Sequence, residues 1–290
     1  MAKTRELKEP KPTGSALITG ASKGIGRAFA IECAKRGFNL ALVALPNSGL
    51  TAIKKYIDKH YTVTVKSFEI DLALPKAPQK IFNWTREENI SVQILINNAG
   101  LGHLGSFTDY TYEFYEKIIR LNIESVVLLT RLYTPELKKH PKGYILNLGS
   151  LASFYPIPYK IVYAGSKSFI YSFSRALNSE LKKTPVQVSI LCPGPIVTSP
   201  EVIARIKQGG YWGRMSSMRA QKMAKISLNA LFREKVVIVP GTINKCLRFI
   251  NNLIPNTFKQ KILTKKFNVN GKASTDNEAK ISEKAAQLDK

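Results

Sequence analysis

The chain has 290 residues, of which 44% are hydrophobic and 22% are charged, as in an ordinary globular protein. This composition excludes a collagen-like repeat, a wholly disordered chain and a disulfide-rich scaffold. The 44 lysines and arginines outnumber the 20 aspartates and glutamates, which gives a formal net charge of +24. A nucleic-acid binder needs a recognition motif or an aromatic platform beside its charge. Neither is present, so nucleic acid is not an expected partner.

The cysteines and the N-terminal segment bear on the compartment. Cys33, Cys192 and Cys246 are far apart and form no CxxC pair, which indicates a reducing compartment and predicts no metal site. Residues 1–12 are charged and lack the apolar core of a signal peptide. No run approaches the ~18 apolar residues of a membrane-spanning helix. We therefore expect a cytoplasmic protein with a short basic leader at residues 1–12.

Strand-like apolar runs alternate with helical patterns along most of the chain. The first run, Ser15–Thr19, ends at Gly20, and a helical stretch follows from Ile25 to Arg36. The later strand-like runs are Asn39–Ala44, Thr62–Phe68, Gln93–Ile96, Tyr144–Leu148, Val186–Leu191 and Val236–Val239. Several are apolar throughout, as strands covered on both faces are. The alternation predicts an α/β fold, a single doubly wound parallel sheet with helices on both faces, over residues 13–267. The polar residues 268–290 are expected to be a disordered tail.

The turn after the first strand is rich in glycine. Residues 19–26 read Thr-Gly-Ala-Ser-Lys-Gly-Ile-Gly and lead directly into a helix. Gly20 allows a tight turn, Gly24 lets the backbone approach a pyrophosphate, and Gly26 lets the helix pack closely on the strand. The glycines alone also suit an ordinary turn, but their position between a first strand and a helix favours a dinucleotide site.

Charge near this turn bears on the choice of cofactor. An NAD site usually places an acidic residue at the end of the second strand, whereas here residues 43–46 read Val-Ala-Leu-Pro. Lys23 lies within the glycine turn, where it can meet a 2′-phosphate. NADP(H) is therefore the expected cofactor. NAD(H) remains open, because the arginine often found after the second strand is also missing.

Tyr163 and Lys167 are spaced so that they share one face of a helix, one turn apart. Such a pair is weak evidence alone. Ser150 follows the fifth strand and Asn122 lies within an earlier helical stretch, so four residues of one chemistry occur together.

With these residues in view, the chain resembles the classical short-chain dehydrogenase/reductase family over about residues 13–240. The matching pieces, in the family's order, are residues 19–26, Asp71-Leu72, Asn97-Asn-Ala-Gly100, Asn122, Ser150, Tyr163-Ala-Gly-Ser-Lys167 and Pro193-Gly-Pro-Ile-Val-Thr198. The resemblance implies a Rossmann-type domain and an enzyme that acts on CH–OH or C=O groups. Residues 236–245 and the Leu253-Ile-Pro segment look similar to the branch that holds long-chain 3-oxoacyl-CoA reductases and related bacterial ketoreductases.

The resemblance also implies a role for each matched residue. Tyr163 would be the general acid in reduction, Ser150 would hold the carbonyl oxygen, and Lys167 would bind the nicotinamide ribose and lower the pKa of the phenol. Asn122 would keep a water in the proton relay. The cofactor would be held by Gly20, Ser22, Lys23, Gly24, Ile25, Gly26, Asp71, Leu72, Asn98, Ala99, Gly100, Tyr163, Lys167, Pro193, Gly194, Ile196 and Thr198.

The substrate side is expected in the segment after the sixth strand, with a lid at about residues 199–218. Apolar residues there, among them Tyr211 and Trp212, alternate with basic ones. They form either an apolar channel with a basic rim, suited to a greasy ketone with an anionic handle, or a cap on the core. Leu101 and Tyr155 are expected to line the same pocket. His103 is expected to be a loop residue beside it rather than a catalyst.

The basic excess is concentrated towards the C-terminus. Between Arg205 and Lys266 there are fourteen basic residues and one acidic residue, Glu234. This is either a solvated lysine-rich surface or a patch for an anionic membrane, an acyl carrier or another acidic partner. The helical extension at about 241–267 could lie on an anionic membrane. Packing on its own domain or on a sister subunit is the favoured alternative.

These observations predict an NADPH-dependent carbonyl reductase of an acyl-chain or other hydrophobic ketone. One alternative is an NAD(P)-dependent alcohol dehydrogenase that runs in the oxidative direction. Another is a cofactor-binding protein without turnover that uses its basic surface. The resemblance also implies a homo-oligomer, either a dimer or a tetramer.

Overall fold

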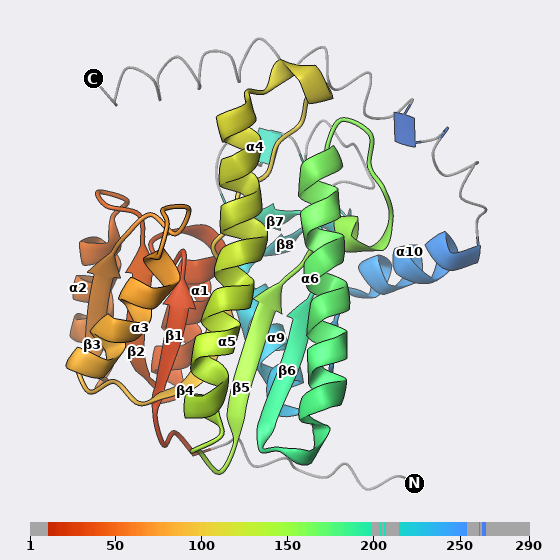
Figure 1. Ribbon diagram of the computed structural model, residues 1–290. Coiled ribbons are helices and arrows are strands. Elements are labelled where there is room, and N and C mark those ends of the chain that lie inside the picture. The colour runs from red at the N-terminus through yellow and green to blue at the C-terminus, as the bar shows by residue number, and fades with distance from the viewer. Residues whose placement is uncertain are drawn as a thin grey trace, which may run out of the picture.

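A computed structural model describes residues 11–198 and 215–253, together with residues 203, 204, 206, 261, 263 and 264. Its centre is a seven-stranded sheet with the strand order β3-β2-β1-β4-β5-β6-β9 (Figure 1). Every neighbouring pair is parallel. The strands are β1 (Ser15–Thr19), β2 (Asn39–Ala44), β3 (Val65–Glu69), β4 (Val92–Asn97), β5 (Gly143–Leu148), β6 (Val186–Leu191) and β9 (Val237–Ile238). The predicted doubly wound parallel sheet is confirmed.

Helices cover both faces of the sheet, three on each (Figure 1). One face carries α1 (Gly24–Lys35), α2 (Leu50–His60) and α9 (Ala220–Phe232), and the other carries α3 (Ala77–Glu87), α5 (Ser125–Leu137) and α6 (Ile161–Glu180). Successive strand residues point to opposite faces, so Ile18 and Ile96 enter the first core while Leu17 and Leu95 enter the second. The strands are apolar throughout because both faces are buried.

The strand order reverses between β1 and β4, and in open α/β sheets ligands bind beyond the carboxyl ends of the strands at this point. The smaller elements are α4 (Tyr112–Ile119), a π-helical turn (Arg120–Glu124), α10 (Thr242–Leu253) and the two-stranded sheet of β7 (Ile196–Val197) and β8 (Met218–Arg219). The part of the chain that the structure describes also has three short 3-10 helices, Phe107–Asp109, Leu151–Phe154 and Leu181–Lys183.

The bounds of β3, β4, β5 and β9 differ from the sequence prediction, those of β4 by one residue at each end and that of β5 by one residue at its start. β3 begins at Val65 rather than at Thr62, because the Asn39 side chain binds the backbone N–H of Thr64 and so takes the place of a ladder bond. β9 is limited to Val237–Ile238, since only these residues pair with β6. The fifth strand ends at Leu148, two residues before Ser150.

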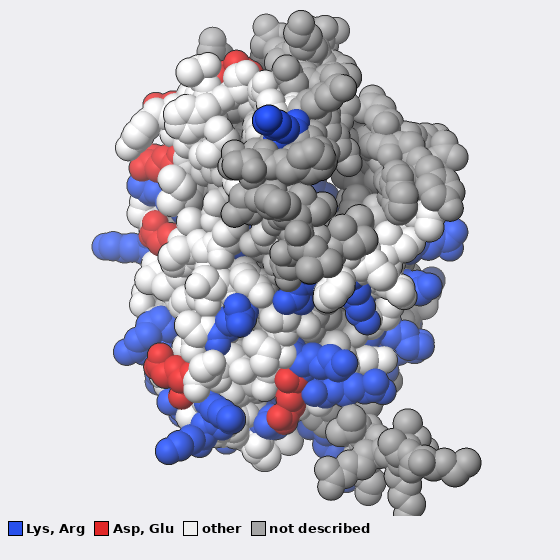
Figure 2. Space-filling model, turned by 90° about the vertical axis from the view of Figure 1, so that its right-hand side faces the viewer, with Lys and Arg blue, Asp and Glu red and all other residues white. Residues whose placement is uncertain are grey.

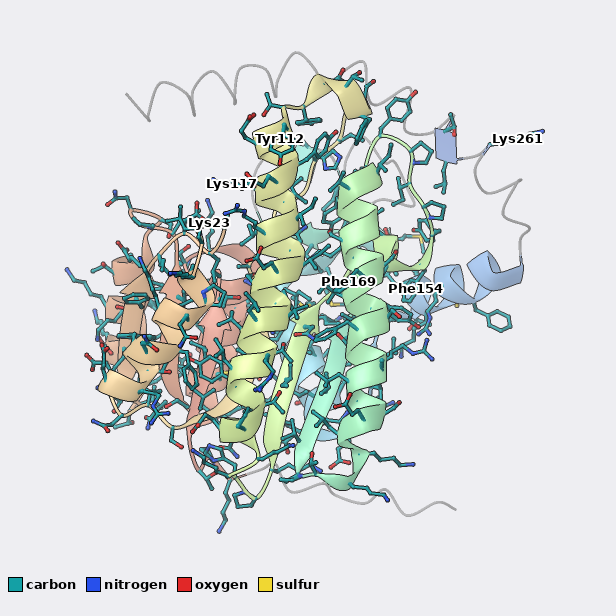
Figure 3. All side chains as sticks on the ribbon, viewed as in Figure 1. Lys23, Tyr112, Lys117, Phe154, Phe169 and Lys261 are labelled. Atoms are coloured by element: carbon teal, nitrogen blue, oxygen red, sulfur yellow. The ribbon has the colours of Figure 1, made fainter. Side chains whose placement is uncertain are left out.

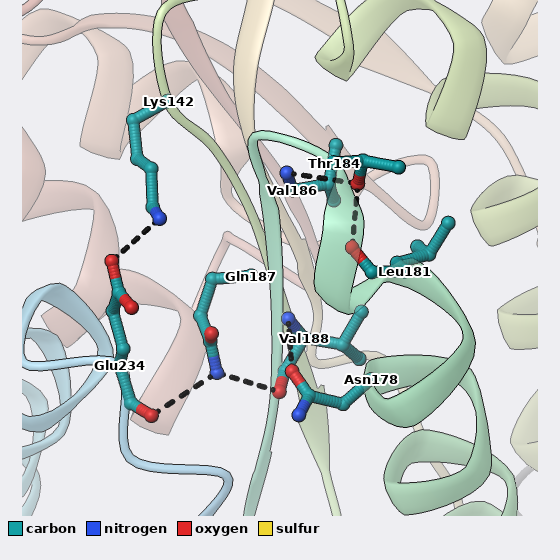
Figure 4. A network of polar contacts seen from close by, with 8 residues as sticks. All are labelled: Lys142, Asn178, Leu181, Thr184, Val186, Gln187, Val188 and Glu234. Atoms are coloured by element: carbon teal, nitrogen blue, oxygen red, sulfur yellow. Dashed lines mark hydrogen bonds and ion pairs between the residues drawn. The ribbon is translucent and has the colours of Figure 1, made fainter.

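A polar network anchors β9 at the amino ends of the strands (Figure 4). Lys142 pairs with the Glu234 carboxylate at 2.5 Å. The Gln187 amide donates to the backbone oxygens of Glu234 and Val188 at 3.3 and 3.1 Å. Asn178 of α6 accepts from the backbone N–H of Val188 at 3.2 Å. These contacts fix the approach to β9 at the end of the sheet opposite the site described below.

Basic side chains cover much of the surface. Figure 2 shows lysine and arginine spread over the lower part of the α6 side, with few acidic side chains between them. Within the described ranges, every helix is too short or too polar to cross a membrane.

Candidate active site

The glycine turn is folded tightly at the end of β1. Gly20 and Gly24 have φ values of +65° and +57°, a region that residues with a Cβ rarely adopt. A Cβ on Gly26 would collide with the backbone oxygen of Gly20. The Asn98 amide, at the end of β4, donates to the backbone oxygens of Thr19 and Gly20 at 2.8 and 3.1 Å. The turn is therefore held by its neighbour strand and leaves the first N–H groups of α1 directed at the switch point, a geometry that suits a pyrophosphate.

The basic residue of the turn is exposed. Lys23 is the N-cap residue of α1, and its side chain lies at the carboxyl end of the sheet (Figure 3). As expected, β2 ends without an acidic residue. A carboxylate nevertheless comes from the next strand: Glu69 is in register with Ala44, and its Oε2 lies 3.4 Å from the backbone nitrogen of Asn47. The sequence did not reveal this neighbour, because it depends on the register of β3 against β2.

Asp71 follows β3 and is held from two sides. Its Oδ1 accepts from the backbone N–H of Ala73 at 2.9 Å, and its Oδ2 pairs with Lys117 of α4 at 3.3 Å. Figure 3 shows Lys117 at the same end of the sheet as Lys23. The neighbouring Leu72 is buried, so of this pair the Asp71 carboxylate is the group available to a ligand.

Tyr163 and Lys167 lie in the first two turns of α6, beside the end of β5. Lys167 is only 6% exposed, and its Nζ donates to the backbone oxygen of Leu148 at 2.8 Å. The Nζ lies 5.9 Å from the centre of the Tyr163 ring. Burial lowers the pKa of Lys167 to about 8. Burial also raises the pKa of Tyr163, and a hydrogen bond with the Ser150 hydroxyl opposes that rise.

Asn122 is brought to this cluster by the π-helical turn. Its side chain accepts from the backbone N–H of Leu101 at 2.9 Å, donates to the Leu101 oxygen at 2.8 Å and donates to Ser166 at 3.1 Å. A Cβ on Gly100 would lie 3.2 Å from Asn122 Oδ1 and 3.4 Å from Lys167 Nζ. The four residues picked out in the sequence thus meet at one place. The π-helical turn itself went unpredicted, because one additional residue leaves no periodic signal.

The Pro193–Thr198 segment lies between the loop at Ser150 and the glycine turn. The backbone oxygen of Pro193 accepts from Leu151, directly after Ser150, at 3.0 Å. Ile196 is buried in β7. A Cβ on Gly24 would lie 3.2 Å from the methyl group of Thr198. The segment therefore runs from the Ser150 loop to the glycine turn, while Gly194 and Ala99 lie half-buried between.

Cys192 is a neighbour that the sequence analysis did not single out. It is fully buried and close enough to Tyr163 and Lys167 to influence the pKa of each. Burial raises the pKa of the Cys192 thiol to about 12, so it is uncharged at neutral pH. The one sequence signal for this location beside Tyr163 and Lys167 is that Cys192 directly precedes the Pro193–Thr198 motif.

The residues predicted for the substrate side are described in part. Tyr155 packs with Tyr163 in one apolar cluster, and Leu101 is half-buried. Tyr211 and Trp212 lie outside the described residues, as does most of the lid segment 199–218. The basic leader 1–12, apart from residues 11 and 12, and the tail 268–290 lie outside them as well.

His103 is buried in an aromatic cluster beside the site. Its ring centre lies 5.1, 6.0 and 5.6 Å from those of Tyr110, Phe114 and Tyr115. Burial, and then the charge of Lys160, lowers its pKa to about 4. The imidazole is therefore neutral at physiological pH and packs as part of the loop.

Several known proteins are similar to this chain in sequence and in fold. The family model described as short chain dehydrogenase matches residues 15–206. The very-long-chain 3-oxoacyl-CoA reductase of Anas platyrhynchos is 33% identical over 198 residues, which cover 66% of this chain and 62% of the relative. That of Pyrenophora tritici-repentis (strain Pt-1C-BFP) is 35% identical over 201 residues, which cover 67% and 58%. The chain thus matches less than two thirds of the length of these relatives.

Two solved structures extend the comparison. The bulky-bulky ketone specific alcohol dehydrogenase from Comamonas testosteroni is 27% identical, with a TM-score of 0.70 over 83% of this chain and 91% of that one. A short-chain dehydrogenase from Sphingobium yanoikuyae, solved in complex with NADPH, is 28% identical, with a TM-score of 0.69 over 83% and 96%. The family model spans well over half of the chain. The chain therefore belongs to the short-chain dehydrogenase family.

Proposed function

We propose that the protein is an NADPH-dependent carbonyl reductase that acts on a hydrophobic or acyl-chain ketone. The observation that carries this proposal is the geometry around the Tyr163 phenol: the buried Lys167 ammonium lies 5.9 Å from its ring centre, and the Ser150 hydroxyl is close enough to lower its pKa. This group lies at the same end of the sheet as the glycine turn. Hydride and proton can therefore be delivered to one carbonyl from two directions.

The cofactor would be bound by the residues around the switch point. The glycine turn and the start of α1 bind the pyrophosphate, Asp71 faces the adenine side, and Gly194 and Thr198 flank the nicotinamide. When bound, the nicotinamide supplies the hydride. The tight packing of Gly20 against Asn98 and Ala99, which leaves no room for a side chain, supports this fit because it holds the turn in a fixed shape.

In the reduction, the Tyr163 phenol gives its proton to the carbonyl oxygen as hydride reaches the carbonyl carbon. Ser150 donates to the same oxygen and aligns it. An unperturbed phenol requires about 4 kcal/mol to ionise at pH 7. Lys167 offsets this requirement, because an ammonium close to the ring stabilises the phenolate that the transfer leaves. Asn122 and Gly100 hold the path along which a proton returns to Tyr163.

The substrate class follows from two observations. Curated relatives that are 33% and 35% identical are named very-long-chain 3-oxoacyl-CoA reductases. Tyr155 adds an apolar wall beside Tyr163. We therefore place 3-oxoacyl thioesters first among the substrates. Because the Comamonas testosteroni neighbour is named an alcohol dehydrogenase, oxidation of the matching 3-hydroxy compound is the second candidate.

A homo-oligomer is part of the proposal. Leu128 of α5 is 40% exposed and Phe169 of α6 is 45% exposed, on helices that cover one face of the sheet (Figure 3). Large apolar side chains on two adjacent helices favour burial against a second copy.

The test is a fluorescence titration of the purified protein with NADPH and, in parallel, with NADH. We expect tighter binding of NADPH, followed by its consumption with 3-oxoacyl thioesters. Tighter binding of NADH would contradict the cofactor assignment and favour the oxidative direction. If neither nucleotide binds, the protein is not an enzyme of this class, and a role for its basic surface takes precedence.

A further inference from the structure

Asn244 of α10 is a buried polar residue outside the segment that the family model matches. Its side chain is 3% exposed. The Nδ2 atom donates to the backbone oxygens of Pro240 and Ser216 at 2.8 and 3.1 Å. Its Oδ1 has no hydrogen-bond partner among the described residues. One amide thus joins the start of α10 to the segment that leads into β8.

The same amide packs against the Pro193–Thr198 segment. A Cβ on Gly194 would lie 2.8 Å from both Nδ2 and Oδ1 of Asn244, and 2.9 Å from the backbone oxygen of Ser216. Such distances mean that Gly194 and Asn244 are in direct contact with no room between them. Met218 also donates its backbone N–H to the oxygen of Pro195 at 3.1 Å. Both α10 and the segment that leads into β8 therefore contact the Pro193–Thr198 segment.

One helical turn later, α10 contacts the opposite flank of the reaction centre. The Arg248 guanidinium lies 4.7 Å from the centre of the Phe154 ring, and it donates to the Tyr171 hydroxyl at 3.4 Å. Phe154 belongs to the short helix capped by Ser150, and Figure 3 shows it beside α10. Thus α10 touches the loop behind Ser150 on one side and Gly194 on the other.

From these contacts we infer that Asn244 is a positioning residue for the nicotinamide end of the cofactor site. The inference rests on the proposed function, in which Gly194 flanks the nicotinamide. Asn244 touches neither substrate nor cofactor in this role. It fixes the position of the Gly194 backbone. That position sets the distance between the nicotinamide ring and a substrate carbonyl bound at Tyr163. Within the described residues, no hydrogen bond, ion pair or ring contact joins Lys23 or Asp71, at the adenine end, to α10.

The test compares Asn244→Ala with Lys245→Ala, a control on the adjacent exposed position of the same helix. Two ligands are titrated: NADPH, and 2′-phospho-ADP-ribose, which has the adenine end and the pyrophosphate but no nicotinamide. Misplacement by 1 Å can lower a rate about 100-fold, so we expect Asn244→Ala to lower kcat by roughly 10- to 100-fold. NADPH should bind several-fold more weakly, while the fragment binds as in the wild type. Lys245→Ala should change none of these values.

Equal weakening of both ligands would mean a general structural role and would overturn the inference, as would an unchanged kcat. If Asn244→Ala does not fold, Asn244→Asp keeps the size but turns an oxygen towards the Pro240 and Ser216 carbonyls, and the same selective loss is expected. A wild-type protein that binds neither ligand would refute the proposed function itself. A wild type that binds and reduces, with a variant that does the same, would refute only the role of Asn244.

Discussion

Lys167 meets two opposing demands at a single position. The proposed reaction requires a charged ammonium next to Tyr163. The side chain is buried, however, and burial lowers its pKa to about 8. A buried cation of this kind destabilises the folded protein, and the hydrogen bond to Leu148 compensates only in part. The proposed reaction, rather than folding, therefore accounts for the residue.

Replacing Lys167 with Met should separate the two demands. Turnover should be lost, while the free energy of unfolding at pH 7 should rise by about 1 to 2 kcal/mol, because the desolvation penalty exceeds the lost hydrogen bond. Below pH 8 the lysine is charged in both the folded and the unfolded state, so the gain is largest there. Above pH 8 the folded lysine becomes neutral first, and the gain shrinks towards pH 10.5. Urea unfolding at several pH values measures this. A variant less stable than the wild type would contradict it.

Tyr163→Phe isolates the acid proton. The ring and its packing against the cluster of Ala152, Ile157 and Ala164 remain, so NADPH binding should change little. Carbonyl reduction should fall by at least 10²- to 10⁴-fold, the usual contribution of a general acid. Stopped-flow reduction and a parallel NADPH titration give both values. Retention of wild-type turnover would remove Tyr163 from the mechanism.

At the scale of elements, the proposed cofactor preference depends on the glycine turn after β1 and on the edge formed by β2 and β3. Lys23 favours a 2′-phosphate, whereas Glu69 brings a carboxylate beside the end of β2. The two residues act in opposite directions. The preference for NADPH over NADH is therefore expected to be moderate.

Lys23→Ala should reduce NADPH affinity by about 1 kcal/mol, roughly fivefold, and leave NADH affinity unchanged, since an exposed charge pair contributes about this much. Glu69→Gln should shift the preference towards NADPH. Lys35→Ala removes the same charge from the far end of α1 and serves as the control. Parallel titrations of each variant with NADPH and with NADH measure these affinities. Equal losses for NADPH and NADH in Lys23→Ala would mean that another residue meets the 2′-phosphate.

The elements also show how far sequence reasoning reaches. Tyr163 and Lys167 could be paired in advance because a helix fixes the relation between residues four apart. The doubly wound parallel sheet followed from apolar runs alternating with helical patterns. Glu69 could not be found, because the register of two strands is set by packing rather than by local pattern. Asn244 was missed for a similar reason: it reaches Gly194 across fifty residues of chain, through a contact that only the folded backbone creates.

At the scale of the whole molecule, charge is the dominant property. The chain has a net charge of +24, and the face shown in Figure 2 has many lysine and arginine side chains with few acidic ones between them. Like charges repel within the folded protein and weaken it at low ionic strength. The same charge keeps molecules apart and favours anionic surfaces.

Salt should therefore stabilise the protein. Raising NaCl from about 0.02 M to 0.3 M shortens the screening length from roughly 20 Å to under 10 Å. We expect Tm at pH 7 to rise by about 3 °C, which corresponds to about 1 kcal/mol for a domain of this size. Near the isoelectric point, pI ≈ 9.9, the same addition should have little effect. A fall in Tm with salt at pH 7 would mean that attractive pairs outweigh repulsion.

The π-helical turn at Arg120–Glu124 also limits how this chain can shorten during evolution. Loss of any one of these five residues would join α4 and α5 into one regular α-helix. By itself, such a helix is more stable than one interrupted by a π-helical turn. Every residue on one side of the deletion would then rotate by about 100° relative to the other, since a turn holds 3.6 residues. Asn122 could keep its bonds to Leu101 or the buried face of α5 could stay on the sheet, but not both. Lineages that retain the proposed reaction should therefore tolerate substitutions in this turn, other than at Asn122, far better than a change in its length.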